Sequence, residues 1–182
     1  MSGDTGRAIT AILVDGKICA ERSSIVEGLL AKGYGVEDTP SGYVTYSYPE
    51  ALYLIENGWM KVVDKQGVEL DFNKLLEELK QLDENVWRDY VIYRDLRKRK
   101  YVVKDGFNEE LRFRVFERGK YGEEPAKYIV APVVEGRNLP MKKLQEWLTT
   151  CRSMRKELVI AVVDRRNEVV YYMARLVDLR NL

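Results

Sequence analysis

Histidine is absent from the 182 residues of this chain, and its absence restricts the acid–base chemistry that the chain can perform. Histidine is the only side chain whose unperturbed pKa lies in the neutral range, and it is the usual proton donor and acceptor in metal-free catalysis. Tyrosine, lysine and the carboxylates remain for such work. They gather with arginine in three stretches, which are YRDLRKR at 93–99, FRVFERG at 113–119 and SMRKELVIAVVD at 153–164.

These stretches, together with YVVKDGF at 101–107, resemble motifs of the tRNA-splicing endonuclease family. Weaker support comes from EALYLI at 50–55 and GYG at 33–35, so the resemblance covers nearly the whole chain. It implies cleavage of pre-tRNA at bulge-helix-bulge elements without a metal or other cofactor. In that reaction the 2′-hydroxyl attacks the adjacent phosphate, and the products carry a 2′,3′-cyclic phosphate and a 5′-hydroxyl.

The family uses a tyrosine as base, a histidine as acid and a lysine that stabilises the transition state. At the matching positions this chain has Phe116 for the tyrosine and Pro125 for the histidine, and it retains Lys156. Thr149 stands where the family has an arginine that clamps a bulged base. The resemblance therefore implies a non-catalytic, structural subunit of an archaeal α2β2 heterotetramer, whose symmetry spaces the active sites of its catalytic partner chains.

Other readings remain open at this point. An active RNase could use Tyr121 as base together with Lys156. A magnesium nuclease would need close carboxylates and a lysine, such as Asp105, Glu124 and Lys127. A non-enzymatic RNA-binding protein would expose aromatic side chains on a sheet.

The two halves of the chain differ in charge. Residues 1–80 carry 8 basic and 13 acidic side chains, a net −5, whereas residues 81–182 carry 22 and 16, a net +6. The basic half is the better candidate for contact with a phosphate backbone. The predicted RNA-binding residues lie at the end of an expected helix, where the helix dipole also favours cations; they are Arg94, Arg97, Lys98, Arg99 and Lys104.

The last expected strand, at 169–177, is apolar on both faces, so it is more apolar than a free edge strand should be. The family associates through this strand and through an acidic loop that precedes it. We therefore predict a partner interface at Asp164, Glu168, Val169, Tyr171 and Met173. The alternative is a central strand that is buried within one monomer.

Composition indicates the cellular compartment of the protein and the kinds of metal site that are not expected. Cys19 and Cys151 are the only cysteines, which favours a reducing cytoplasm over a disulfide framework. Without histidine or a Cys-x-x-Cys motif, no zinc site is expected. The chain has no apolar run of transmembrane length and no signal-peptide pattern, so a cytoplasmic location is expected.

The elements that must position these residues follow from periodicity and capping signals. An α+β N-terminal domain is predicted over 1–82. It should begin with a hairpin at 8–20 that turns at Asp15-Gly16, followed by a helix at 24–32 with a capping box of Ser24 and Glu27. The remaining expected elements are a strand at 43–46, a helix from Ser47 to Gly58, a strand at 61–63 and a helix at 72–82 capped by Asp71. An α/β C-terminal domain with a mixed sheet is predicted over 83–182, with helices at 85–99 and 140–151 and strands at 111–115, 128–134, 158–163 and 169–177.

Overall fold

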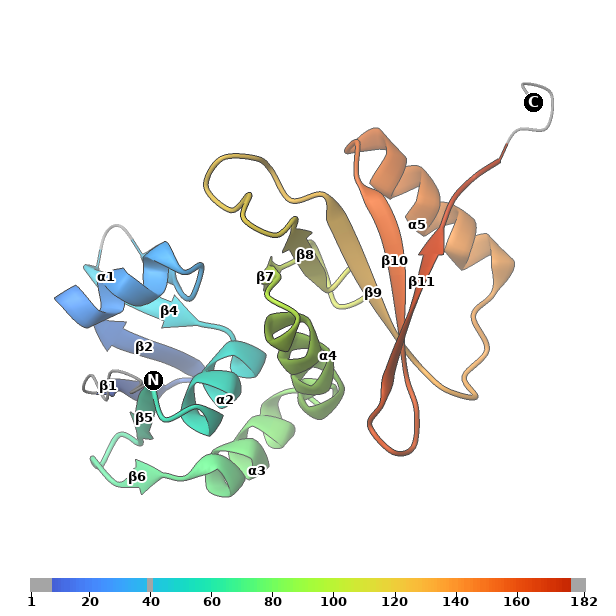
Figure 1. Cartoon of the computed structure of the whole chain (residues 1–182). Helices are drawn as coiled ribbons and strands as arrows, with labels where there is room; N and C mark the ends of the chain where they lie inside the picture. Colours follow the sequence, from blue (N-terminus) through green and yellow to red (C-terminus); the bar gives the residue numbers. More distant parts are fainter. Residues whose placement is uncertain (1–7, 39–40, 178–182) are drawn as a thin grey trace. The chain divides into compact units, whose positions relative to one another are not determined.

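The computed structural model describes residues 8–38 and 41–177, and the chain forms two compact units, Met1–Tyr93 and Arg94–Leu182 (Figure 1). The division falls inside helix α4, Val86–Lys98, whereas the sequence places a domain boundary between residues 82 and 83. That earlier boundary stays a prediction. None of the helices in the described ranges combines the length and hydropathy needed to span a lipid bilayer.

The N-terminal unit is built on a six-stranded sheet in the order β3-β4-β2-β1-β5-β6. Strands β1 and β5 pair in parallel, and the other neighbours are antiparallel. The α+β class predicted for this half is therefore confirmed. Its elements are β1 Ile9–Val14, β2 Lys17–Glu21, α1 Ser24–Ala31, β3 Val36–Asp38, β4 Tyr43–Tyr46, α2 Tyr48–Glu56, β5 Met60–Val63, β6 Glu69–Leu70 and α3 Phe72–Leu82.

Local sequence signals explain most of these boundaries. Asp15 and Gly16 have φ values of 50° and 74°, as a tight hairpin turn with two left-handed residues requires. Asp71 caps α3 by accepting a hydrogen bond from the backbone N–H of Lys74 at 2.9 Å. The predicted capping box at Ser24 is wrong by one residue, because the hydroxyl of Ser23 accepts the hydrogen bond from Val26 at 3.3 Å.

The C-terminal unit contains a five-stranded sheet in the order β11-β10-β9-β8-β7. Strands β9 and β10 are parallel and are connected by α5, while the other pairs are antiparallel, so the predicted mixed sheet is confirmed. Strand β7 was not predicted, because its two valines lie between charged stretches. The elements are β7 Val102–Asp105, β8 Phe113–Phe116, β9 Tyr128–Val134, α5 Met141–Ser153, β10 Glu157–Val163 and β11 Val169–Ala174.

The two faces of this sheet have different neighbours. On one face Ile129 and Leu158 pack with Trp147 and Cys151 of α5. Strand alternation turns the adjacent Val130 and Val159 to the opposite face. Strand β11 pairs with β10 alone and forms one edge of the sheet, so the alternative of a central, buried final strand is wrong.

Candidate functional site

The sheet register brings the three family positions to one end of the C-terminal unit. Val115 of β8 lies opposite Tyr128 of β9, which in turn lies opposite Glu157 of β10. Just beyond that row lie Phe116, which follows Val115, the loop that ends before Tyr128, and Lys156, which precedes Glu157. Two backbone hydrogen bonds tie them together, from the Lys127 N–H to the Val115 carbonyl and from the Glu157 N–H to the Lys127 carbonyl, both at 3.0 Å.

Phe116, which the resemblance places at the position of the base, has no ionisable proton. It is half-buried, and the ring of Tyr121 packs edge-on against it with the centroids 4.9 Å apart. Pro125 is exposed in the loop that leads into β9, and its side chain offers no acid. Neither position can exchange a proton with a substrate.

Lys156 is retained, and its ammonium donates a hydrogen bond to the backbone carbonyl of Ala126. Ala126 is buried, and Lys156 is half-buried at the start of β10. The left-handed conformation of Arg155, at φ 55°, lets the chain turn from α5 into the strand, and the Lys156 N–H closes that turn on the Cys151 carbonyl at 2.9 Å. The ammonium therefore joins the start of β10 to the β8–β9 loop.

The position of the family's base-clamping arginine has no cation. Thr149 is exposed on α5, and its hydroxyl donates to the carbonyl of Gln145 at 2.9 Å, within its own helix. A threonine hydroxyl that is bonded within its own helix cannot stack on a base as a guanidinium does.

The residues of the magnesium-nuclease reading are each engaged elsewhere. Asp105 pairs with Arg112 at 2.8 Å, Glu124 pairs with Lys120 at 2.9 Å, and Lys127 pairs with Glu117 at 3.1 Å. The hydrogen bond and charge of Glu117 raise the pKa of Lys127. Within residues 8–38 and 41–177, no group of three or more acidic or cysteine side chains is arranged to hold a metal ion.

The predicted RNA-binding residues do not form one uniform surface. Arg97 is only 6% exposed, so little of its side chain is open to solvent. Arg94 and Lys104 are half-buried, whereas Lys98 and Arg99 are exposed. Contact of these residues with RNA stays a prediction.

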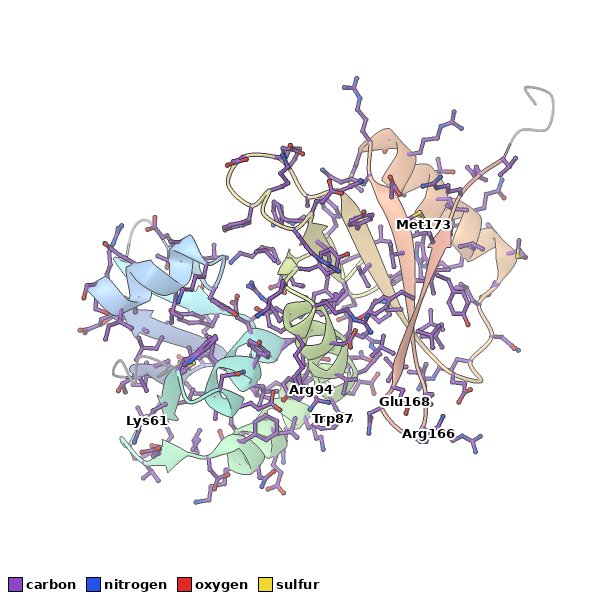
Figure 2. All side chains as sticks on the ribbon, viewed as in Figure 1. Lys61, Trp87, Arg94, Arg166, Glu168 and Met173 are labelled. Atoms are coloured by element: carbon purple, nitrogen blue, oxygen red, sulfur yellow. The ribbon has the colours of Figure 1, made fainter. Side chains whose placement is uncertain are left out.

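The β10–β11 turn, where Figure 2 labels Arg166 and Glu168, is stabilised by the side chain of Asp164. The Asp164 carboxylate accepts hydrogen bonds from the backbone N–H groups of Arg166 and Glu168, both at 2.8 Å. The bond from Glu168 is the main reason that the pKa of Asp164 lies below its usual value. Glu168 is exposed at the turn, 3.4 Å from the guanidinium of Arg166.

A contact that the sequence did not predict holds Tyr171 of the edge strand. Its hydroxyl donates to the Asp95 carboxylate at 2.9 Å, and the same carboxylate accepts from Arg99 Nε at 2.8 Å. Burial, followed by the charge of Asp95, raises the pKa of Tyr171 well above its usual range. The four-residue spacing of Asp95 and Arg99 on a helix indicates their pairing, but nothing in the sequence links either to Tyr171.

Comparison with known proteins shows which family the two halves of the chain match. The profile described as the N-terminal domain of tRNA intron endonuclease matches residues 9–76, and that of its catalytic C-terminal domain matches residues 86–171.

Three relatives illustrate the similarity. The tRNA-splicing endonuclease of Methanococcus vannielii is 34% identical over 166 residues, which are 91% of this chain and 93% of the relative. That of Thermococcus onnurineus is 34% identical over 84% of this chain and 87% of the relative. That of Methanosarcina acetivorans is 30% identical over 86% of this chain but only 43% of the relative. This chain therefore belongs to the tRNA intron endonuclease family.

Proposed function

We propose that this chain is a structural subunit of a tRNA-splicing endonuclease, which positions catalytic partner chains for the cleavage of pre-tRNA introns at bulge-helix-bulge sites. The observation that carries the proposal is the composition of the site where β8, the β8–β9 loop and β10 meet. That site holds Phe116 and Pro125, and its lysine is bound to a backbone carbonyl. The fold of the family is present without the two groups that would move protons.

Without a base and an acid, this chain should cleave RNA far more slowly than a catalytic subunit. A positioned acid or base contributes typically about 10²–10⁴-fold. The chain has no histidine to take over either role. Tyr121 is the nearest candidate for a substitute base, and its ring packs on Phe116.

The exposed edge of the C-terminal sheet supports a role in assembly. Val170, Tyr172 and Met173 of β11 are 50%, 57% and 49% exposed. An apolar edge strand of this kind normally pairs with another chain. The predicted interface at Val169, Tyr171, Met173, Asp164 and Glu168 includes this strand and the turn before it.

The proposal is tested by a cleavage assay on a bulge-helix-bulge RNA. The purified chain alone should release no product with a cyclic phosphate end, whereas the chain co-expressed with a catalytic family member from the same genome should. Robust cleavage by the chain alone would identify it as an enzyme, with Tyr121 as the first residue to mutate.

Lys156→Ala supplies the sharper control. In this chain it should leave the activity of the assembled enzyme within about twofold, because Phe116 and Pro125, at the positions of the family's base and acid, cannot share the chemistry. The equivalent change in the partner's lysine should abolish cleavage. A loss of about a hundredfold on changing this chain alone would return Lys156 to a catalytic role.

A further inference from the structure

A second concave surface lies on the face of the C-terminal sheet opposite α5. It is a pocket of about 280 Å³ whose lining comes from α4, the segment between α4 and β7, β8 and the residues after it, β9, β10 and β11. Val115, Val130 and Val159 form part of an apolar floor, together with Leu96 and Met173. Because side chains alternate along β8, Phe116 faces the other side of the sheet from Val115, and the pocket is separate from the degenerate site.

Three tyrosines around this pocket each carry a cation over the ring. The guanidinium of Arg118 lies 4.8 Å from the ring centroid of Tyr101, and that of Arg99 lies 5.8 Å from the centroid of Tyr171. The third ring, Tyr128, has the Lys127 ammonium at 5.4 Å from its centroid. Aromatic faces and cations thus surround an apolar floor.

Only one of these cations has no carboxylate partner. Arg99 pairs with Asp95 at 2.8 Å, and Lys127 pairs with Glu117 at 3.1 Å. Arg118 is exposed, its Nη2 lies 3.5 Å from the Tyr101 hydroxyl, and it forms no ion pair with any residue of the described ranges. Arg118 is therefore the cation at this pocket that is best placed to bind an anionic ligand.

We propose that this pocket binds one unstacked base of single-stranded RNA, with the adjacent phosphate held by Arg118. Splayed bases are recognised by stacking on aromatic rings and arginine planes, and the apolar floor suits a flat, weakly hydrated face. The volume lies just below the range of about 300–1,000 Å³ that drug-sized ligands occupy, which fits a single base. The inference rests on the proposed function only in taking RNA as the ligand.

The test uses the full chain without any partner, labelled with ¹⁵N and titrated with AMP and with UMP. Both nucleotides should shift the backbone signals of the pocket residues, and adenosine or inorganic phosphate alone should bind more weakly. Arg118→Ala should weaken AMP binding by about tenfold, because it removes the charge that holds the phosphate.

Arg152→Ala is the matched control, since Arg152 is an exposed arginine in the last turn of α5. It should change AMP binding by less than about twofold, because a distant surface charge is screened. Arg118→Gln, which keeps the length of the side chain, serves as a second variant if Arg118→Ala fails to fold.

Two results would overturn the proposal. Equal loss of binding in the Arg118 and Arg152 variants would show non-specific attraction to a basic surface. Signals of the pocket that respond to the catalytic partner and not to AMP or UMP would assign the pocket to a protein interface. Neither result changes the outcome expected in the cleavage assay, so that assay tests the structural-subunit proposal separately.

Discussion

At the scale of single residues, Phe116 and Pro125 offer no group that can transfer a proton, and Lys156 lies near them at the same end of the sheet. Phenylalanine at 116 preserves an aromatic ring at the end of β8, and Tyr121 packs on it. Lys156 links two loops through the Ala126 carbonyl. A lysine that satisfies a backbone acceptor has a structural reason to be present, whether or not an acid and a base accompany it.

The bond between Tyr171 and Asp95 is the best target for a stability measurement at this scale. Tyr171→Phe should lower the free energy of unfolding by about 1–2 kcal/mol, because it removes a hydrogen bond to a charged acceptor and leaves the ring in place. Tyr172→Phe is the control, since Tyr172 is 57% exposed on the other face of β11, and it should change stability by less than about 0.5 kcal/mol. Urea unfolding followed by circular dichroism measures both.

The same variant carries a dependence on pH. The pKa of Tyr171 is raised in the folded chain, mainly by burial, above the ordinary tyrosine value of about 10. The folded state then holds the proton more tightly than the unfolded state, so this contribution to stability is complete below pH 10 and is lost as the pH rises above it. The stability advantage of the wild type over Tyr171→Phe should shrink as the pH rises above about 10, and a constant difference would contradict the assignment.

At the scale of elements, β11 determines how the chain can meet a partner. The predicted interface includes both Tyr171 and Met173, but the two side chains differ in exposure. Met173 is 49% exposed, whereas Tyr171 is half-buried and hydrogen-bonded to Asp95. A charge at Tyr171 would lie beside Asp95 and disturb the fold, so Tyr172 is the better probe of an interface.

Tyr172→Glu should therefore leave the chain folded and abolish its complex with the catalytic partner, because an unpaired charge in a buried contact costs several kcal/mol. Val68→Glu is the matched control, since Val68 is a similarly exposed apolar residue, at 55%, in the N-terminal unit. Circular dichroism reports folding and size-exclusion chromatography reports assembly. Intact assembly of both Tyr172→Glu and Met173→Glu would direct attention to the β10–β11 turn at Glu168 instead.

At the scale of the whole molecule, the division of labour that we propose requires a symmetric assembly. A substrate with two cleavage sites needs two active sites at a fixed spacing, and closed two-fold symmetry supplies it. The complex with the catalytic chain should therefore have a 2:2 composition. Multi-angle light scattering of the co-expressed complex measures this, and a 1:1 mass with full cleavage activity would contradict the arrangement.

The sequence by itself determined which residue types are missing and where most of the helices and strands form, although β3, β6 and β7 were not predicted. The absence of histidine follows from residue identity alone, whereas the assignment of Phe116 and Pro125 to the family's base and acid positions is a prediction from the resemblance. The Asp15-Gly16 turn and the Asp71 cap also come from the sequence, because they depend on neighbours within a few residues.

Only the tertiary structure decided which side chains meet across the fold. Tyr171 and Asp95 are 76 positions apart, and Lys156 and Ala126 are 30 apart. Their contacts depend on strand order and register, which local periodicity does not encode. The burial of Arg97 and the edge position of β11 were settled in the same way, because burial and edge status belong to the assembled sheet and not to the individual segment.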